Sequence, residues 1–316
     1  MTLERVSRRL SWLGYGACAL AGCLWGTGFY FGKLALREMS VGHMVLYRFL
    51  FASLGMLPVV LTAGRRRGPR WTRRETTTLL IAATLGIPLQ FLLQFEGLAR
   101  TTVSHASLMV GTMPVLLALG ATIFAGERLD AIGWVALAGS TVGAALIVLG
   151  GRSGADSAAA AGGPTLAGDL LVVLSLTIAL GWILMNKSLM QVHSPLAVTA
   201  YGLLSGTAML VVWVTAVDGP PPFARVSMTA WLALAASGVL CTATTTALWN
   251  WGIHHVPASR AGVFLNIEPA LGSWLGVQLL GDKLGPFAWV GGGMILAAAV
   301  TLTVRGEATE AEVILE

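Results

Sequence analysis

The most conspicuous charged side chain in this sequence is Glu268, which lies about ten residues into an apolar stretch and is followed by Pro269. A carboxyl group placed deep in a membrane is costly and marks a functional site by default. Pro269 lacks a backbone N–H, so nearby carbonyls are predicted to be free for a ligand. Glu268 is therefore predicted to bind a substrate ammonium or carry a proton, or else to fix a helix contact as a hydrogen-bonded carboxyl.

A second pair of charges, Arg48 and Glu96, is predicted to lie at a similar depth near one end of the apolar stretches. One interpretation is an ion pair that gates the mouth of a pathway. The alternative is that Arg48 extends its guanidinium to the membrane interface, as long basic side chains do. Lys33, close to a helix end, is expected to do the same.

Amide side chains recur on single helix faces, because residues four apart on a helix are neighbours. Such faces suit a cavity that combines amide hydrogen bonds with flat aromatic surface, and they equally suit plain bonding between helices. The predicted substrate-binding residues are Trp25, Tyr30, Gln90, Gln94, Trp182, Asn186, Asn250 and Glu268.

No catalytic or nucleotide-binding motif accompanies these residues. The adjacent residues His254 and His255 would point about 100° apart on a helix, which disfavours a shared metal ion. Cys18, Cys23 and Cys241 lie in apolar stretches and are interpreted as small core residues. We therefore expect no metal, no cofactor and no enzymatic reaction.

The composition indicates the medium in which these residues must work. The 316 residues are 55% hydrophobic and 11% charged, whereas soluble domains carry about 25% charged residues. A soluble protein of this size could not cover its surface with so few polar groups, but lipid removes that requirement. The net charge of +5 is interpreted as a topology signal rather than as a sign of nucleic-acid binding.

Ten stretches approach the roughly 20 apolar residues that a membrane-spanning helix needs. With the N-terminus in the cytoplasm, most Lys and Arg residues fall on the cytoplasmic side, as the positive-inside rule requires. We therefore predict a multi-pass protein of the cell (inner) membrane with both termini cytoplasmic. The predicted spans are about 13–36, 41–62, 77–98, 102–124, 130–150, 168–190, 196–217, 229–253, 258–280 and 285–304.

An internal repeat divides the chain. An offset of 155 residues aligns Gly97 with Gly252, Pro114 with Pro269 and Trp134 with Trp289, among other matches. Five spans per half is an odd number, so the halves must be inverted relative to each other, as in many secondary transporters. The predicted fold is all-α and integral to the membrane, with repeats at 1–150 and 167–316 and a Gly/Ala/Ser-rich linker at 151–166.

Several short motifs carry a resemblance to a known family. They are Leu24-Trp25-Gly26, Arg48-Phe49, Gly126-Glu127-Arg128-Leu129, Gly168-Asp169-Leu170 and Glu268-Pro269. In order and spacing the chain resembles the EamA-type transporters of the drug/metabolite transporter superfamily over about 13–304. The resemblance implies ten helices and export of amino acids or other small metabolites, often proton-linked or by exchange. The second half departs from the motifs, since Leu180 and Leu203 stand where Trp25 and Arg48 stand in the first half.

Functions from different classes remain open at this point. The preferred hypothesis is a secondary transporter that exports small metabolites such as amino acids by alternating access, with membrane lipid and a small-molecule substrate as partners and no nucleic acid. The alternatives are a membrane-embedded enzyme acting on lipid, with Glu268 and His105 as acid and base, and an efflux carrier for drugs or quaternary ammonium compounds. A scaffold without transport would leave the carboxyl of Glu268 unexplained.

Overall fold

The computed structural model describes residues 3–63, 70–113, 115–116, 120, 131–152, 164–220, 226–255 and 263–315. Within these ranges only the backbone is described for 3–11, 59–63, 148–152, 187, 250, 253–255, 263, 299 and 302–315. Every regular element in the described part of the chain is a helix. The Gly126–Leu129 motif, Pro114 and most of the predicted linker lie outside the described residues.

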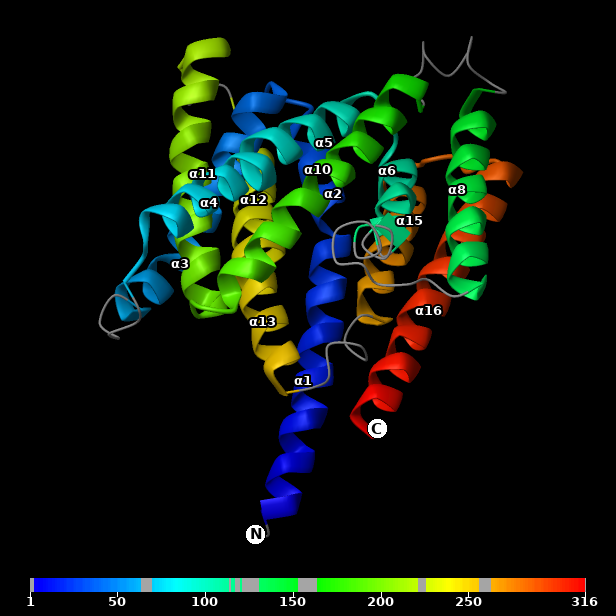
Figure 1. Ribbon diagram of the computed structural model, residues 1–316. Coiled ribbons are helices and arrows are strands. Elements are labelled where there is room, and N and C mark those ends of the chain that lie inside the picture. Colours follow the sequence, from blue (N-terminus) through cyan, green and yellow to red (C-terminus); the bar gives the residue numbers. More distant parts are fainter. Residues whose placement is uncertain are drawn as a thin grey trace.

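The helices follow the predicted apolar stretches, and several spans consist of consecutive helical segments (Figure 1). Their bounds are α1 Leu3–Gly26, α2 Gly28–Ala35, α3 Val41–Ala63, α4 Arg73–Thr84, η1 Leu85–Leu89, α5 Gln90–Ala99, α6 Val103–Val110, α8 Ala131–Arg152, α10 Leu166–Met190, α11 Pro195–Val217, α12 Met228–Ala235, η3 Ala236–Thr244, α13 Thr245–His255, η4 Val263–Asn266, α15 Ile267–Leu280 and α16 Pro286–Leu315.

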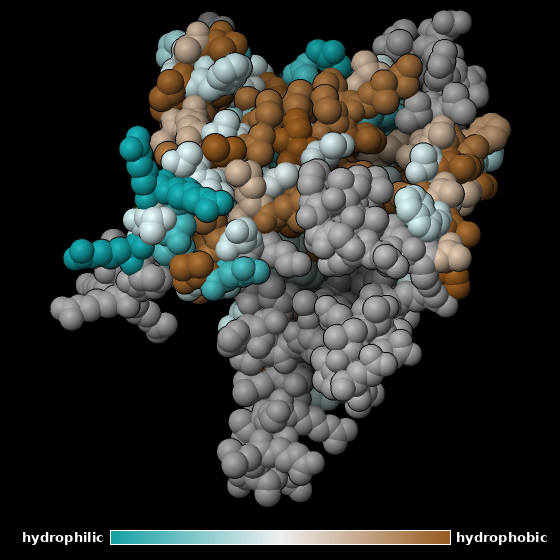
Figure 2. All heavy atoms as spheres, in the orientation of Figure 1, coloured by the Kyte–Doolittle hydropathy of each residue, from teal (hydrophilic) through white to brown (hydrophobic). Residues whose placement is uncertain are grey.

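Five helices are long and apolar enough to cross a membrane, by length and composition. They occupy Val41–Pro58, Arg73–Ala99, Leu166–Met190, Pro195–Val217 and Met228–Trp249, and two shorter apolar helices lie at Ala131–Ile147 and Pro286–Ala298. On the face shown in Figure 2, hydrophobic side chains cover much of the coloured surface. Large apolar side chains such as Val135, Val212 and Trp289 are exposed on it. Lipid accepts such a surface and water does not, and the chain is accordingly a multi-pass membrane protein.

Two of these spans change to π-helix partway along. The first, η1, contains Pro88, which has no N–H to give to a regular α-helical bond. Adding the repeat offset of 155 to 85–89 gives 240–244, which is the last part of η3. Single π-helical turns inside α-helices often occur at functional sites, and both of these lie in the interior of the bundle.

The offset also relates helices that pack together. Helix α8 packs against α16 and α3 against α11, and each partner lies about 155 residues further along. Helix α6 packs against α15, which begins two residues after the positions 258–265 that match α6. The pairing of α1 with α13 corresponds to that of α10 with α5, with the halves exchanged. Small residues allow the close approaches, for example between Gly143 and Gly291.

Loop contacts follow the same relation. Glu38 accepts hydrogen bonds from the Ser227 hydroxyl and backbone N–H, each at 2.6 Å, and these bonds hold the pKa of the Glu38 carboxyl below its ordinary value. The residue 155 positions after Glu38 is His193. Its ring stacks on Trp71 at 3.7 Å between centroids, and its Nε2 lies 3.2 Å from Oε2 of Glu75. In both cases a loop of one half contacts the start of a helix in the other half.

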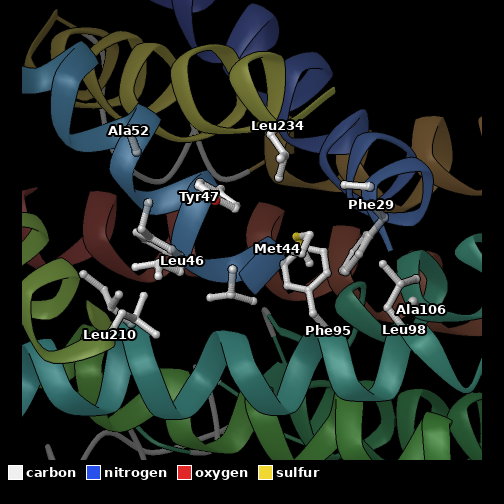
Figure 3. Packing of buried hydrophobic residues seen from close by; sticks show 14 of the residues in the cluster. Phe29, Met44, Leu46, Tyr47, Ala52, Phe95, Leu98, Ala106, Leu210 and Leu234 are labelled. Carbon is white, nitrogen blue, oxygen red and sulfur yellow. The ribbon is translucent and has the colours of Figure 1, made fainter. Parts of the chain in front are cut away.

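The hydrophobic core lies mainly where α2, α3 and α5 meet α12 (Figure 3). Part of this core, including Ala35 and Leu98, lies at the end of the bundle where α2, α5 and α15 finish and where α3, α6 and α10 begin. We call this end the closed end, because residues there such as Ala35, Met44, Leu98 and Ser104 are fully buried. Helices α1 and α16 extend away from the bundle on the opposite side, toward both chain termini (Figure 1).

Candidate functional site

Arg48 is the centre of the candidate site. It lies on α3 with only 5% of its surface exposed. Its Nε donates to Oγ1 of Thr242 at 3.2 Å, and its guanidinium carbon lies 5.1 Å and 5.2 Å from the ring centroids of Phe91 and Phe95. These distances are those of cation–π interactions. Among the described residues, its two terminal nitrogens make no hydrogen bond to the protein.

The predicted pair of Arg48 with Glu96 is not formed, and this prediction was wrong. Glu96 pairs instead with Arg100, four residues along the same helix, at 2.5 Å, and both side chains are largely exposed. Arg48 also does not extend to the interface, because aromatic rings cover it on the α5 side. Glu96 therefore has its partner on its own helix and not on α3.

Lys33 is a further correction, since its side chain does not extend to the interface either. Its Nζ donates to the carbonyl oxygens of Leu98 at 2.6 Å and Thr101 at 2.7 Å. These carbonyls belong to the end of α5, where helix carbonyls lack partners and a cation is favourable.

The π-helix η3 supplies the second wall of the site. Thr242 accepts the Arg48 bond and donates to the Ser237 carbonyl at 3.1 Å, five residues back, as π-helical geometry allows. Next to it, the buried Cys241 Sγ lies 3.1 Å from Oγ1 of Thr27, at the break between α1 and α2. The π-helix thereby turns two successive polar side chains toward the region of Arg48.

Glu268 lies in the same region, in the first turn of α15, and its side chain is partly accessible. The charges of Arg48 and Glu268 act on each other, although no ion pair within 4.0 Å joins them among the described residues. The N-terminus of a helix favours a carboxylate. Pro269 stands in this first turn, where an N–H would lack an intrahelical partner anyway. Its own carbonyl accepts from Ser273 Oγ at 2.7 Å, so the predicted freeing of carbonyls by Pro269 is not seen there.

Trp25 lies on α1, one residue before the point at which α1 packs on α15 at Glu268. The next residue, Gly26, packs so closely on α15 that an added Cβ would lie 3.1 Å from the Glu268 carbonyl oxygen. The Trp25 ring contacts the ring of Trp249 at 5.5 Å between centroids, and both rings are partly accessible. Tyr30 contacts its neighbour Phe31 at 5.5 Å. An aromatic pair therefore lies where α1 meets α13, next to the contact of α1 with α15.

The remaining predicted residues lie around a second helix contact. Gln90 and Gln94 are buried on the face of α5 that continues from Gly86 to Gly97, and this face packs on α10. Trp182 of α10 lies directly on Gly86. Oε1 of Gln90 is buried without a hydrogen-bond partner in the described part of the chain. Asn186 is partly accessible on α10, and the side chain of Asn250 lies outside the described residues.

The structure thus places Arg48 and Glu268 in one region, with Trp25 on the adjoining helix α1 and with Gln90 and Trp182 at a neighbouring helix contact. Around Glu268 the side chains of Trp25, Trp249 and Phe264 are partly accessible, and so are those of Tyr30 and Phe31 on α2. A surface hollow of about 610 Å³ between α4 and α10, lined by Arg74 and Leu184 among others, includes none of the site residues.

Sequence reasoning missed Phe91, Phe95, Cys241, Thr242 and Trp249. The two phenylalanines were detectable, because they alternate with Gln90 and Gln94 at the same four-residue spacing and must face one neighbouring helix. The Arg48–Thr242 contact joins residues 194 positions apart, and only the folded arrangement brings them together.

A buried guanidinium whose terminal nitrogens have no partner among the described residues, together with a carboxyl inside a bundle of apolar helices, is consistent with a membrane transporter. The sequence pattern of the EamA-like transporter family matches residues 12–149 and 166–304. The chain belongs to this family, and it is a transporter rather than an enzyme.

Known relatives agree with this assignment. The chain is 26% identical over 287 residues to an uncharacterized transporter of Archaeoglobus fulgidus, covering 90% of this chain and 95% of the relative. It is 26% identical over 296 residues to a probable terminal-alkyne amino-acid exporter of Streptantibioticus cattleyicolor, covering 92% and 93%. A crystal structure with 17% identity superposes with a TM-score of 0.63 over 96% of this chain and 99% of that chain, so the two share a fold.

Proposed function

We propose that this protein is a secondary transporter that exports small zwitterionic metabolites, amino acids in particular, by alternating access. The observation that carries the proposal is Arg48. A charge is costly to bury unless it is paired, and its terminal nitrogens have no partner in the described protein. A substrate carboxylate would supply one, because a guanidinium binds a carboxylate through two parallel hydrogen bonds.

The other half of a zwitterion finds its partners close by. Glu268 attracts an ammonium group, and the Trp25–Trp249 surface stacks on an apolar or aromatic side chain and attracts cations. A quaternary ammonium compound, the alternative cargo, would meet the repulsive charge of Arg48. A phosphorylated sugar would require several cations around one group. The name of the Streptantibioticus relative supports export of an amino acid.

The proposed architecture is ten membrane-spanning helices in two inverted five-helix repeats, residues 1–150 and 167–316, joined by 151–166. The double match of the family pattern, the packing of helices 155 residues apart and the two π-helices support it. Both termini are proposed to face the cytoplasm of the cell (inner) membrane, so the closed end faces outward. Membrane-impermeant labelling of a cysteine at Arg70 from outside, or of one at Ser157 only after permeabilisation, contradicts this orientation.

No cofactor enters the proposal, and Glu268 is the group proposed to exchange a proton during transport. The test is intracellular accumulation of a labelled aromatic or branched amino acid in cells with and without the protein. We expect lower accumulation with the protein. Unchanged accumulation of every amino acid together with expulsion of a quaternary ammonium dye would replace this proposal by drug efflux.

A further inference from the structure

A second buried polar cluster lies at the closed end, apart from the Arg48 site. Asp169, in the first turn of α10, is 1% exposed. Its Oδ1 accepts from the Thr101 hydroxyl at 2.5 Å, and its Oδ2 lies 3.2 Å from Nδ1 of His105. Thr101 and His105 are 1% and 2% exposed. The proposed transport site uses none of these three residues, although burying them is costly without a full set of partners.

The cluster lies where two pairs of helices meet. Helix α10 is tied to α5, since the backbone N–H and hydroxyl of Thr165 donate to the Arg100 carbonyl at 3.1 Å and 2.6 Å. The backbones of Gly97 and Gly168 touch at the same crossing. The α5–α10 pair therefore holds Asp169 in place.

The second pair is α6 with α15. The Ser104 hydroxyl donates to the Ser273 carbonyl at 3.0 Å, and the Ser104 N–H donates to Oδ2 of Asp282, just after α15, at 2.8 Å. His105, the next residue, belongs to this pair. Among the described side-chain hydrogen bonds and ion pairs, the bond between Asp169 and His105 is the one that links α10 directly to α6. Other charges near the cluster are Lys33, bonded to the Thr101 carbonyl, and Asp282.

The repeat offset gives no matching carboxyl in the first half of the sequence. At the offset of 155, Asp169 corresponds to Gly14, Thr101 to Val256 and His105 to Arg260. Neither glycine nor valine has a side chain that can form the bond between Asp169 and Thr101. This bond is therefore one of the features by which the two halves differ.

We propose that Asp169, Thr101 and His105 form a latch that holds the closed end shut and biases the resting transporter toward the state closed at this end. The latch rests on the proposed alternating access, which requires this end to open once per cycle. The Asp169 carboxylate can satisfy its hydrogen bonds in two ways. In the closed state Thr101 and His105 donate to it, and in the open state water does. Removing the carboxylate weakens the closed state without touching the Arg48 site.

The experiment measures how readily the closed end opens. A cysteine is placed at Ala35, which is fully buried two residues after Lys33, in the full-length protein in detergent. Modification of position 35 by a polar maleimide is followed by mass spectrometry in the parent and in Asp169→Asn, Thr101→Val and Glu96→Gln. Glu96→Gln is the matched control, because this carboxyl lies near the same end but is exposed and pairs within its own helix.

We expect Asp169→Asn to raise the modification rate roughly tenfold, as loss of a charge-assisted hydrogen bond predicts. Thr101→Val should raise it less, and Glu96→Gln should leave it unchanged. Parent rates in both cluster variants, with monodisperse elution, overturn the latch. A lower unfolding temperature at an unchanged rate also overturns it, since that describes packing alone. If Asp169→Asn does not fold, Thr101→Val decides.

The labelling needs no substrate, so it can be separated from the proposed function. If Asp169→Asn is labelled faster but the parent protein transports no amino acid, the latch is supported and the proposal of amino acids as substrates fails. If the cluster variants are labelled at the parent rate and the parent protein does transport amino acids, only the latch is refuted.

Discussion

Replacement of Arg48 by Gln separates substrate binding from folding, because binding should weaken while the stability of the fold should not fall with it. Glutamine keeps a donor for Thr242 but removes the charge and the bidentate fork. Hydrogen bonds to charged groups contribute about 1.5–3 kcal/mol each, so loss of one net bond to a substrate carboxylate should weaken binding about 10–150-fold. The cation–π interactions with Phe91 and Phe95 are lost too, at about 0.5–2 kcal/mol.

Protein stability should not fall in step, because removing a buried unpaired charge also removes its desolvation cost. The assay is the Kd of a labelled amino acid for the purified protein, with the unfolding temperature measured on the same samples. Arg100→Gln is the control, since this arginine is exposed and lies outside the site. A Kd within twofold of the parent in Arg48→Gln would refute the carboxylate-binding role. A large fall in unfolding temperature would show that Arg48 serves the fold instead.

The other predictions concern the carboxyl group, the π-helical crossing and a loop contact. Glu268→Gln should abolish or uncouple transport while the protein still elutes as a single species; a parental rate and pH profile in vesicles would reduce Glu268 to a packing role. Gly86→Ala should destabilise the protein by about 1–3 kcal/mol, because its Cβ would meet the Trp182 ring, and a chemical unfolding curve measures this. Because the pKa of Glu38 is depressed by its bonds from Ser227, that contact stabilises the fold above the unfolded pKa and is lost as pH falls through the folded one. Glu38→Gln should therefore lower the unfolding temperature at neutral pH and lose this effect in acid; an equal difference at both pH values contradicts it.

Much of the helical layout could be predicted because it depends on local composition. Apolar stretches such as 166–190 and 195–217 are helices with nearly the predicted bounds, since a chain in lipid must satisfy its backbone within each segment. Helix breaks were harder to predict. The break at Thr27 and the π-helices depend on packing and on single side chains such as Pro88.

The sequence indicated candidate residues of the site better than it indicated which residues contact one another. Trp25, Arg48 and Glu268 were selected because polar and aromatic side chains inside apolar stretches mark candidate binding sites. The partner of each residue depends on the direction in which its side chain points around the helix. For Glu96 the position along the chain did not reveal that its partner is Arg100. Asp169 entered only through a family motif, and its role required its neighbours Thr101 and His105 to be seen.

The central claim, carrier-mediated transport of an amino acid through the Arg48 site, is tested most directly by counterflow in sealed proteoliposomes. Vesicles are loaded with an unlabelled amino acid, and the entry of a trace of the same labelled amino acid is followed. We predict transient accumulation with the parent protein and with Arg100→Gln, and none with Arg48→Gln. Absence of counterflow for every amino acid with the folded parent protein, or equal counterflow in Arg48→Gln, would contradict the claim.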